Sequence, residues 1–259
     1  MSSGEDAAPA EDLSGGLTEV VRIGGTVRRA AGDWTPTVQA LLVHLRRVGF
    51  AGAPRAMGLD PEGREVLEFV DGVGPSHGDD ELVGVGRLIA AFHRASSSFV
   101  EPPNPCWQFM VGAPRAGEVI CHNDLSPDNT VYRPAGAPRA FVDWDLAAPA
   151  PPLWDLAWAA YRFVPLYDDA TCERLGYPIP SRPARLRILC DAYGLGDRQE
   201  LLPTVCERIR VLYDTARTWG EAGRPGWRDV WADTRGEQWL GGLRYVEAER
   251  HRWEPALTS

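Results

Sequence analysis

The stretch of sequence that decides the fold lies at residues 119–145 and reads VICHNDLSPDNTVYRPAGAPRAFVDWD. It is the densest group of polar side chains in the chain. The whole protein has three Asn and five His, yet His122, Asn123 and Asn129 fall within eight residues, next to Asp124. This concentration of carboxylate, amide and imidazole groups indicates a functional site.

The second half of this stretch predicts a β-hairpin. Residues 130–133 and 140–143 have strand-like composition, and the PAGAP turn between them is centred on Gly136. In a symmetric hairpin, Asn129 and Asp143 face each other at the open end, with Cβ atoms about 5 Å apart.

A magnesium site and a general base are predicted at that open end. Two oxygen ligands at this separation can share one Mg²⁺, which otherwise keeps water or substrate phosphate as ligands. Asp124 lies on the loop that leads into the same end, where a further carboxylate is a candidate base for a hydroxyl group under attack. The alternative is that these residues only cap turns.

The amino-terminal segment predicts a tail followed by a hairpin. Residues 1–12 are acidic and rich in Ala and Pro, which favours disorder. Two strand-like runs, residues 19–23 and 26–29, flank the pair Gly24 and Gly25, and such a pair between strands is typical of a hairpin.

One helix and one further strand complete this β-rich region. Thr35 as N-cap and Pro36 at the first helical position predict a helix that ends near Val48. Residues 65–70 predict a strand.

Beyond residue 71 the pattern becomes helical. Apolar residues recur at helical spacing over residues 82–92 and again over residues 205–219. We therefore expect an α+β fold with two lobes: a small β-rich lobe over residues 13–71 and a larger, mainly helical lobe over residues 72–259.

Composition excludes several classes of function. The net charge of -9 argues against a nucleic-acid-binding surface and would suit a cationic small molecule. No apolar run is long enough to span a membrane, and the start of the chain lacks a signal-peptide pattern, so we expect a cytoplasmic protein. The five cysteines form no CxxC pair and are expected to be reduced. Nothing in the sequence indicates an oligomeric state.

Three strings in this chain resemble the aminoglycoside phosphotransferase and kinase-like small-molecule phosphotransferase superfamily. HNDLSPDN at residues 122–129 is similar to its HxDxxxxN catalytic loop, and FVDWD at residues 141–145 is similar to its metal-binding aspartate strand. PLWDLA at residues 152–157 contains an aspartate, Asp155, where the family has a structural anchor for the helical lobe. The resemblance covers roughly residues 13–220 and implies a two-lobed kinase-like fold.

The resemblance also implies roles for individual residues. Asp124 would accept the proton of the substrate hydroxyl, and Asn129 with Asp143 would hold Mg²⁺ against the phosphates of ATP. His122 would brace the loop. The family's remaining nucleotide contacts would fall on Gly15 and Gly16, which match the loop over the phosphates, and on the hinge near Phe69 and Val70, whose backbone groups would bind adenine.

Two departures from the family concern the phosphate-binding cation. The chain contains no Lys, and the family's lysine on the third strand aligns with Arg28, which carries the charge on a wider group. The helix at residues 36–48 lacks the glutamate that orients this lysine and offers only Gln39 and His44; Glu19 is another candidate acid.

The sequence leaves the phosphate acceptor open. The leading hypothesis is an enzyme that phosphorylates a hydroxyl of a small molecule, such as an aminoglycoside-like antibiotic or a metabolite. The rival is a kinase-like immunity or regulatory protein that binds without transfer. A protein kinase is disfavoured, because PAPPLWDLAW follows closely after Asp143 and leaves no room for an activation segment. Acidic residues at 168, 169 and 173 are either a cation-binding patch or an ordinary helix start.

Overall fold

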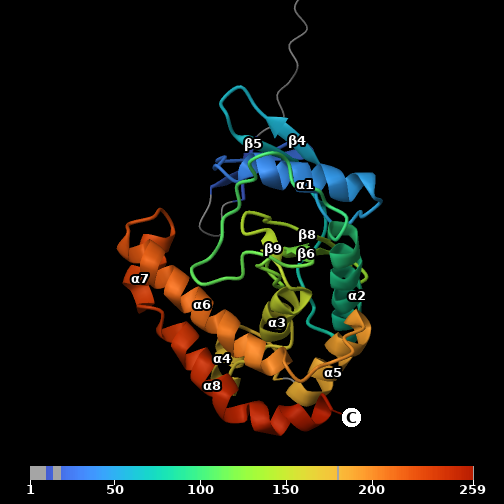
Figure 1. The fold of residues 1–259 in the computed structure, drawn as a ribbon, viewed down its shortest axis with the longest axis vertical. Helices are drawn as coiled ribbons and strands as arrows, with labels where there is room; N and C mark the ends of the chain where they lie inside the picture. The colour runs from blue at the N-terminus through green and yellow to red at the C-terminus, as the bar shows by residue number, and fades with distance from the viewer. Residues whose placement is uncertain (1–9, 14–18, 180, 259) are drawn as a thin grey trace, which may run out of the picture.

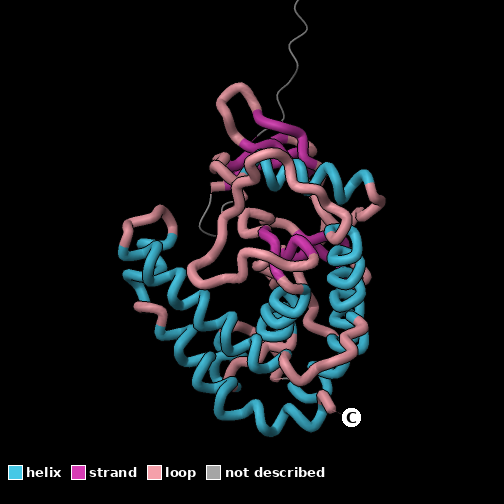
Figure 2. The backbone as a smooth tube through the Cα atoms, viewed as in Figure 1, coloured by secondary structure: helices cyan, strands magenta, loops and turns pink. Residues whose placement is uncertain are grey.

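The fold consists of a small β-rich lobe and a larger helical lobe, seen in a computed structural model (Figures 1 and 2). The structure describes residues 10–13, 19–179 and 181–258. Within these residues, no helix is long and apolar enough to cross a membrane.

The amino-terminal lobe is built on one antiparallel sheet. Its strands are ordered β1-β2-β3-β5-β4. They are β1 (Ala10–Asp12), β2 (Val20–Ile23), β3 (Thr26–Arg29), β4 (Ala56–Leu59) and β5 (Glu65–Glu68). The hairpin predicted at the Gly-Gly pair is confirmed, because β2 and β3 pair directly and Gly24 has a φ of 60°. The predicted disordered tail was too long, since residues 10–12 pair with β2.

Helix α1 (Thr35–Arg47) follows the first hairpin and buries one apolar face. The prediction of Thr35 as N-cap was one residue late. Trp34 is the N-cap, while the Thr35 hydroxyl accepts a hydrogen bond from the Gly32 amide at 2.9 Å. The buried face carries Val38, Leu41, Leu42 and Leu45.

Residues 69–78 connect the two lobes. They lead from β5 into α2 (Asp79–Ser96), and Val73 forms a bridge with Tyr132 of the helical lobe. A second link runs back from the helical lobe, because the Cys106 amide donates to the Thr37 hydroxyl at 2.9 Å. Figure 1 shows this returning segment as the green trace that passes over α1.

Two short hairpin-like sheets lie between the lobes and carry the polar stretch. One pairs β6 (Val119–Cys121) with β9 (Ala148–Ala150), and the other pairs β7 (Thr130–Tyr132) with β8 (Pro138–Phe141). The predicted turn at Gly136 is confirmed by its φ of 84°.

Helices form the remainder of the larger lobe. They are α3 (Pro152–Phe163), α4 (Asp169–Arg174), α5 (Arg182–Tyr193), α6 (Leu201–Glu221), α7 (Trp227–Thr234), α8 (Glu237–Trp253) and the 3-10 turn η1 (Glu254–Ala256). α2 packs against α5, and α6 contacts α3, α7 and α8. Figure 1 shows α6 running diagonally below the central hairpins, with α7 at its upper left end and α8 along its outer side.

Candidate active site

The loop between β6 and β7 is fixed by one buried carboxylate. Asp155, on α3, accepts hydrogen bonds from the amides of His122 at 2.8 Å and Asn123 at 2.9 Å. Nε2 of His93 lies 3.1 Å from the same carboxylate. Burial alone would raise the pKa of Asp155, but these donors hold it below its usual range. Asp155 therefore anchors the loop as an ion, which is the role expected from the PLWDLA string.

Asn123 and His122 continue this bracing. Asn123 has a φ of 65°, and its side chain donates to the carbonyl oxygen of Leu146 at 2.8 Å. Nε2 of His122 lies 3.0 Å from the Val142 carbonyl oxygen, and its Nδ1 accepts from the Asp124 amide at 3.3 Å. Because both ring nitrogens face the backbone and the side chain is fully buried, His122 can orient the loop but has no access to a substrate.

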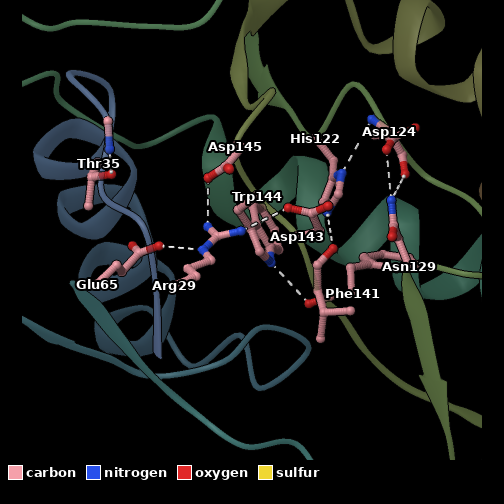
Figure 3. Close-up of polar contacts among 12 residues, drawn as sticks. Arg29, Thr35, Glu65, His122, Asp124, Asn129, Phe141, Asp143, Trp144 and Asp145 are labelled. Carbon is pink, nitrogen blue, oxygen red and sulfur yellow. Dashed lines mark hydrogen bonds and ion pairs between the residues drawn. The ribbon is translucent and has the colours of Figure 1, made fainter. Parts of the chain in front are cut away.

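Asp124 points into an open cleft and is held by two donors. Its Oδ1 accepts from Nε1 of Trp158 at 3.2 Å. Its Oδ2 accepts from Nδ2 of Asn129 at 2.8 Å, as Figure 3 shows. Burial raises the pKa of Asp124 above its usual value, and the nearby Asp143 acts in the same direction. A carboxylate with two fixed donors and spare lone pairs can still accept a proton.

Asn129 and Asp143 lie at the open end of the β7–β8 hairpin, but not in the predicted register. Thr130 pairs with Phe141, so Asn129 is opposite Val142, whose amide donates to the Asn129 carbonyl oxygen at 2.9 Å. Next to the turn, Tyr132 pairs with Pro138, so the strands there are centred on Ala135 rather than Gly136. One extra residue on β8, Arg139, then brings the open end to within one residue of the symmetric register.

Asp143 still reaches the cleft because its backbone turns. Its φ is 62°, and its side chain is 50% exposed. The amide nitrogen of Asn129 is bound to Asp124, which leaves the amide oxygen to face other partners. Both side chains line the same cleft as Asp124.

The cation beside these carboxylates is Arg29, and the prediction of Arg28 is corrected. Neighbouring residues on a strand point to opposite faces. Arg28 lies on the face away from the cleft, with Nε 3.6 Å from Asp60. Arg29 is buried, and its Nη1 lies 2.8 Å from Asp143 Oδ1 (Figure 3).

Three carboxylates surround the guanidinium of Arg29. Besides Asp143, they are Glu65 at 2.6 Å from Nε and Asp145 at 2.7 Å from Nη2. Burial alone would lower the pKa of Arg29, but the charges of Asp145, Glu65 and Asp143 raise it above its usual value. Burial raises the pKa of Asp145, against the pull of Arg29. The cluster has more negative than positive groups, so it can accept a further cation.

Glu65 provides the acid that the sequence did not locate. It is the direct cross-strand partner of Arg29, on β5 rather than on α1. Nε2 of Gln39 on α1 donates to Glu65 Oε1 at 3.3 Å, so the helix supports the ion pair indirectly. Glu19, the suggested alternative, lines the cleft but is not in an ion pair with Arg29 among the described residues. To predict the Arg29–Glu65 pair from the sequence, one would need to know which face of β3 each arginine occupies and how β3 and β5 are aligned.

The predicted nucleotide contacts are only partly described. Gly15 and Gly16 lie outside the described residues. The Phe69 amide donates to the Gly25 carbonyl oxygen at 2.9 Å, and its ring lies 3.7 Å from the Arg22 guanidinium. Phe69 and Val70 are not among the described residues that line the cleft. The adenine contact therefore stays a prediction.

The cleft that contains these groups has a volume of 610 Å³. It lies between the loop after β3, the catalytic loop and helices α6 to α8. Its polar lining includes Asp124, Asp128, Asn129, Asp143, Asp145, Arg162, Arg208 and Arg224, and its aromatic lining includes Trp34, Trp158, Trp227 and Trp239.

A second group of potential metal ligands has a different role. His93, Cys121 and Asp155 offer atoms within 4.8 Å of one another and are all buried. Burial raises the pKa of the Cys121 thiol well above its usual value, so it stays protonated. Asp155 is already bound to backbone amides and His93. This cluster therefore supports the catalytic loop.

The acidic residues after α3 have local partners. Asp168 caps α4 by accepting from the Thr171 amide at 2.9 Å, and Asp169 pairs with Arg182 at 2.8 Å. These contacts favour the helix-start alternative over a cation-binding patch.

The chain is similar in sequence to a known protein family and to a known protein. Residues 106–199 match the phosphotransferase enzyme family. The trifolitoxin immunity protein of Rhizobium leguminosarum bv. trifolii is 39% identical to this chain over 194 residues, with coverage of 71% of this chain and 74% of the relative.

The fold is similar to solved kinase structures. Choline kinase LicA from Streptococcus pneumoniae has a TM-score of 0.59 at 12% identity, over 93% of this chain and 94% of that chain. An aminoglycoside phosphotransferase from Streptomyces rimosus, solved with ADP and streptomycin, has a TM-score of 0.53 at 14% identity, over 80% of this chain and 94% of that chain. The expected two-lobed kinase-like fold is confirmed.

Proposed function

Because this chain belongs to the phosphotransferase enzyme family, we propose that it transfers the γ-phosphate of ATP to a hydroxyl group of a small molecule. The observation that carries this proposal is Asp124, a half-buried carboxylate that lines an open cleft together with Asn129 and Asp143. Structural neighbours solved with AMP, ADP or GDP support the choice of a nucleotide as donor.

The residues at the hairpin end fit Mg²⁺. Asp143 is half-exposed, the amide oxygen of Asn129 is not used by the hydrogen bonds to Asp124, and both offer the hard oxygen ligands that Mg²⁺ prefers. The excess of carboxylates around Arg29 favours an added cation. Bound there, Mg²⁺ would neutralise phosphate charge, and Asn129 and Asp143 would hold it.

Asp124 would act as the base in the transfer step. The acceptor hydroxyl gives its proton to the Asp124 carboxylate while its oxygen forms a bond to the γ-phosphorus. The bond between that phosphorus and the β–γ bridging oxygen breaks, which leaves ADP and a phosphate ester. Trp158 and Asn129 hold the carboxylate in position through its two oxygens.

Arg29 would supply the phosphate-binding cation in place of lysine. A guanidinium can contact phosphate oxygens through two N–H groups, and its charge is present at every physiological pH. Glu65 would keep it aimed at the cleft.

The relative favours a specific biological role. Its name is that of an immunity protein, and it is 39% identical to this chain. We propose that this chain likewise protects its cell from a toxic small molecule or peptide, by phosphorylating it in the cytoplasm. The second candidate is protection by binding alone, without transfer.

The direct test is incubation of the purified protein with Mg-ATP and a library of antibiotics, peptides, sugars and amino alcohols, with mass spectrometry for phosphorylated products. The proposal expects an acceptor-dependent release of ADP together with a phosphate ester. Protection of cells without any phosphorylated product would favour the binding alternative.

A further inference from the structure

The cleft has two walls of opposite character. Its acidic wall carries Asp124, Asp128, Asp143 and Asp145. The other wall is formed by residues 108–110 and by helices α6 to α8. Its described lining residues are Gln108, Met110, Arg208, Leu212, Arg224, Pro225, Trp227 and Trp239, without an acidic residue among them.

Arg224 has no carboxylate partner among the residues that the structure describes. It lies in the turn between α6 and α7, with its guanidinium 4.0 Å from the centre of the Trp219 ring. Its Nη2 donates to the neutral Oε1 of Gln108 at 2.5 Å. Burial lowers the pKa of Arg224, and no nearby acid counteracts this effect. The charge of Arg224 is therefore available to a ligand in the cleft.

Arg208 adds a second positive charge behind the same wall. It is almost fully buried, with its guanidinium 5.0 Å from the ring centres of Trp154 and of Trp158. Its Nη2 donates to the Asn123 carbonyl oxygen. Burial lowers its pKa to about 10, which still leaves it charged at neutral pH.

Aromatic surfaces flank these charges. Trp227 and Trp239 are half-buried and line the cleft, and Trp227 makes an edge contact with Trp219 at 5.2 Å. Tryptophan surfaces favour flat ligands through stacking and burial of apolar area. They could also hold a quaternary ammonium ion, but the adjacent guanidinium of Arg224 would repel it.

We propose that the phosphate acceptor is an aromatic molecule with an anionic group, which Arg224 binds while Trp227 and Trp239 pack against its ring. This proposal rests on the proposed function and names the substrate class for the same cleft. It differs from the expectation of a cationic ligand, which was based on the negative net charge of the whole chain. The wall that carries Arg208 and Arg224, here called the acceptor wall, is positive.

Binding of matched probes to the full-length protein, saturated with Mg-ADP, tests the proposal by calorimetry. N-acetyl-tyrosine carries the ring and a carboxylate, whereas N-acetyl-tyrosinamide has the same ring without charge. Choline and streptomycin represent cations. We expect the carboxylate probe to bind about tenfold more tightly than the amide, since charge-assisted hydrogen bonds to arginine are the strong ones.

Variants separate Arg224 from general effects. Arg224→Gln should remove the preference for the carboxylate, and Arg224→Lys should keep part of it because the charge remains. The matched control is Arg228→Gln, one turn further on, where the arginine is exposed and pairs with Asp229. This control should bind like the wild type.

The outcomes do not depend on phosphate transfer. The proposal is overturned if the two tyrosine probes bind equally, if the carboxylate probe shows no saturable binding, or if choline or streptomycin binds more tightly. It is also overturned if the preference survives in Arg224→Gln. A preference that follows Arg224 in a protein that never transfers phosphate would support an aromatic, anionic ligand for this cleft and reject phosphate transfer to it.

Discussion

The catalytic loop and the strand β3 each fix a charged side chain at or next to the cleft, in different ways. The loop places Asp124 through contacts within the helical lobe, to Asn129 five residues away and to Trp158 34 residues away. Strand β3 places Arg29 through Glu65 and Asp143, which lie 36 and 114 residues away. A motif can specify the first arrangement, whereas the second exists only once the lobes have assembled.

The largest expected effect comes from the two neighbouring arginines of β3. Arg29→Ala would leave Glu65, which is 1% exposed, as an unpaired buried charge, at a cost of about 3–5 kcal/mol in the free energy of unfolding. Arg28→Ala is the control and should cost less than about 1 kcal/mol, because its contact to Asp60 is long. Urea unfolding measures both, and equal costs would contradict the assignment of Arg29.

Replacing Asp155, which anchors the catalytic loop, should lower the free energy of unfolding somewhat less. Asp155→Asn keeps the volume but turns an amide N–H toward one of three donors, which should cost about 2–3 kcal/mol. The matched control is Asp128→Asn, since Asp128 is 73% exposed and, within the described part of the chain, its ion pair is with Arg162 at 2.7 Å. Thermal and urea unfolding of both variants would test this. An unchanged stability of Asp155→Asn would show that the loop is held by other contacts.

Asp143→Ala should leave the fold intact, because the side chain is half-exposed, and should weaken Mg-ATP binding at least about tenfold. Calorimetry with and without Mg²⁺ measures this effect. If the variant bound Mg-ATP as tightly as the wild type, Asp143 would not be a ligand.

The smallest expected effect is a shift in pH dependence. Transfer requires ionised Asp124, so the rate should fall as the pH drops through its pKa, which burial raises above the usual aspartate value. Trp158→Phe removes a donor that lowers this pKa and should move the acid limb of the kcat/KM profile to higher pH. A limb that stays in place, or moves to lower pH, would contradict the role of Asp124 as base.

The sequence predicted the helical lobe, both hairpins and the catalytic loop, because turns, helical periodicity and a compact motif are local signals. It failed where a single residue of register matters. The pairing of β7 with β8 places Asn129 opposite Val142 instead of Asp143, and strand alternation turns Arg29 rather than Arg28 toward the carboxylates of the cleft. The acceptor wall was also missed, since Arg224 and Trp239 come together only through the packing of α6 to α8.

The most direct test of the phosphotransferase account compares Asp124→Asn with Asp128→Asn. It uses cells challenged with a compound against which the wild type protects, and Mg-ATP assays with the acceptor found in the library screen. Asp124→Asn should bind nucleotide normally but lose about 10²- to 10⁴-fold in transfer rate, together with protection, while Asp128→Asn keeps both. Protection by Asp124→Asn cells equal to that of the wild type, with no phosphorylated product in either, would contradict the account.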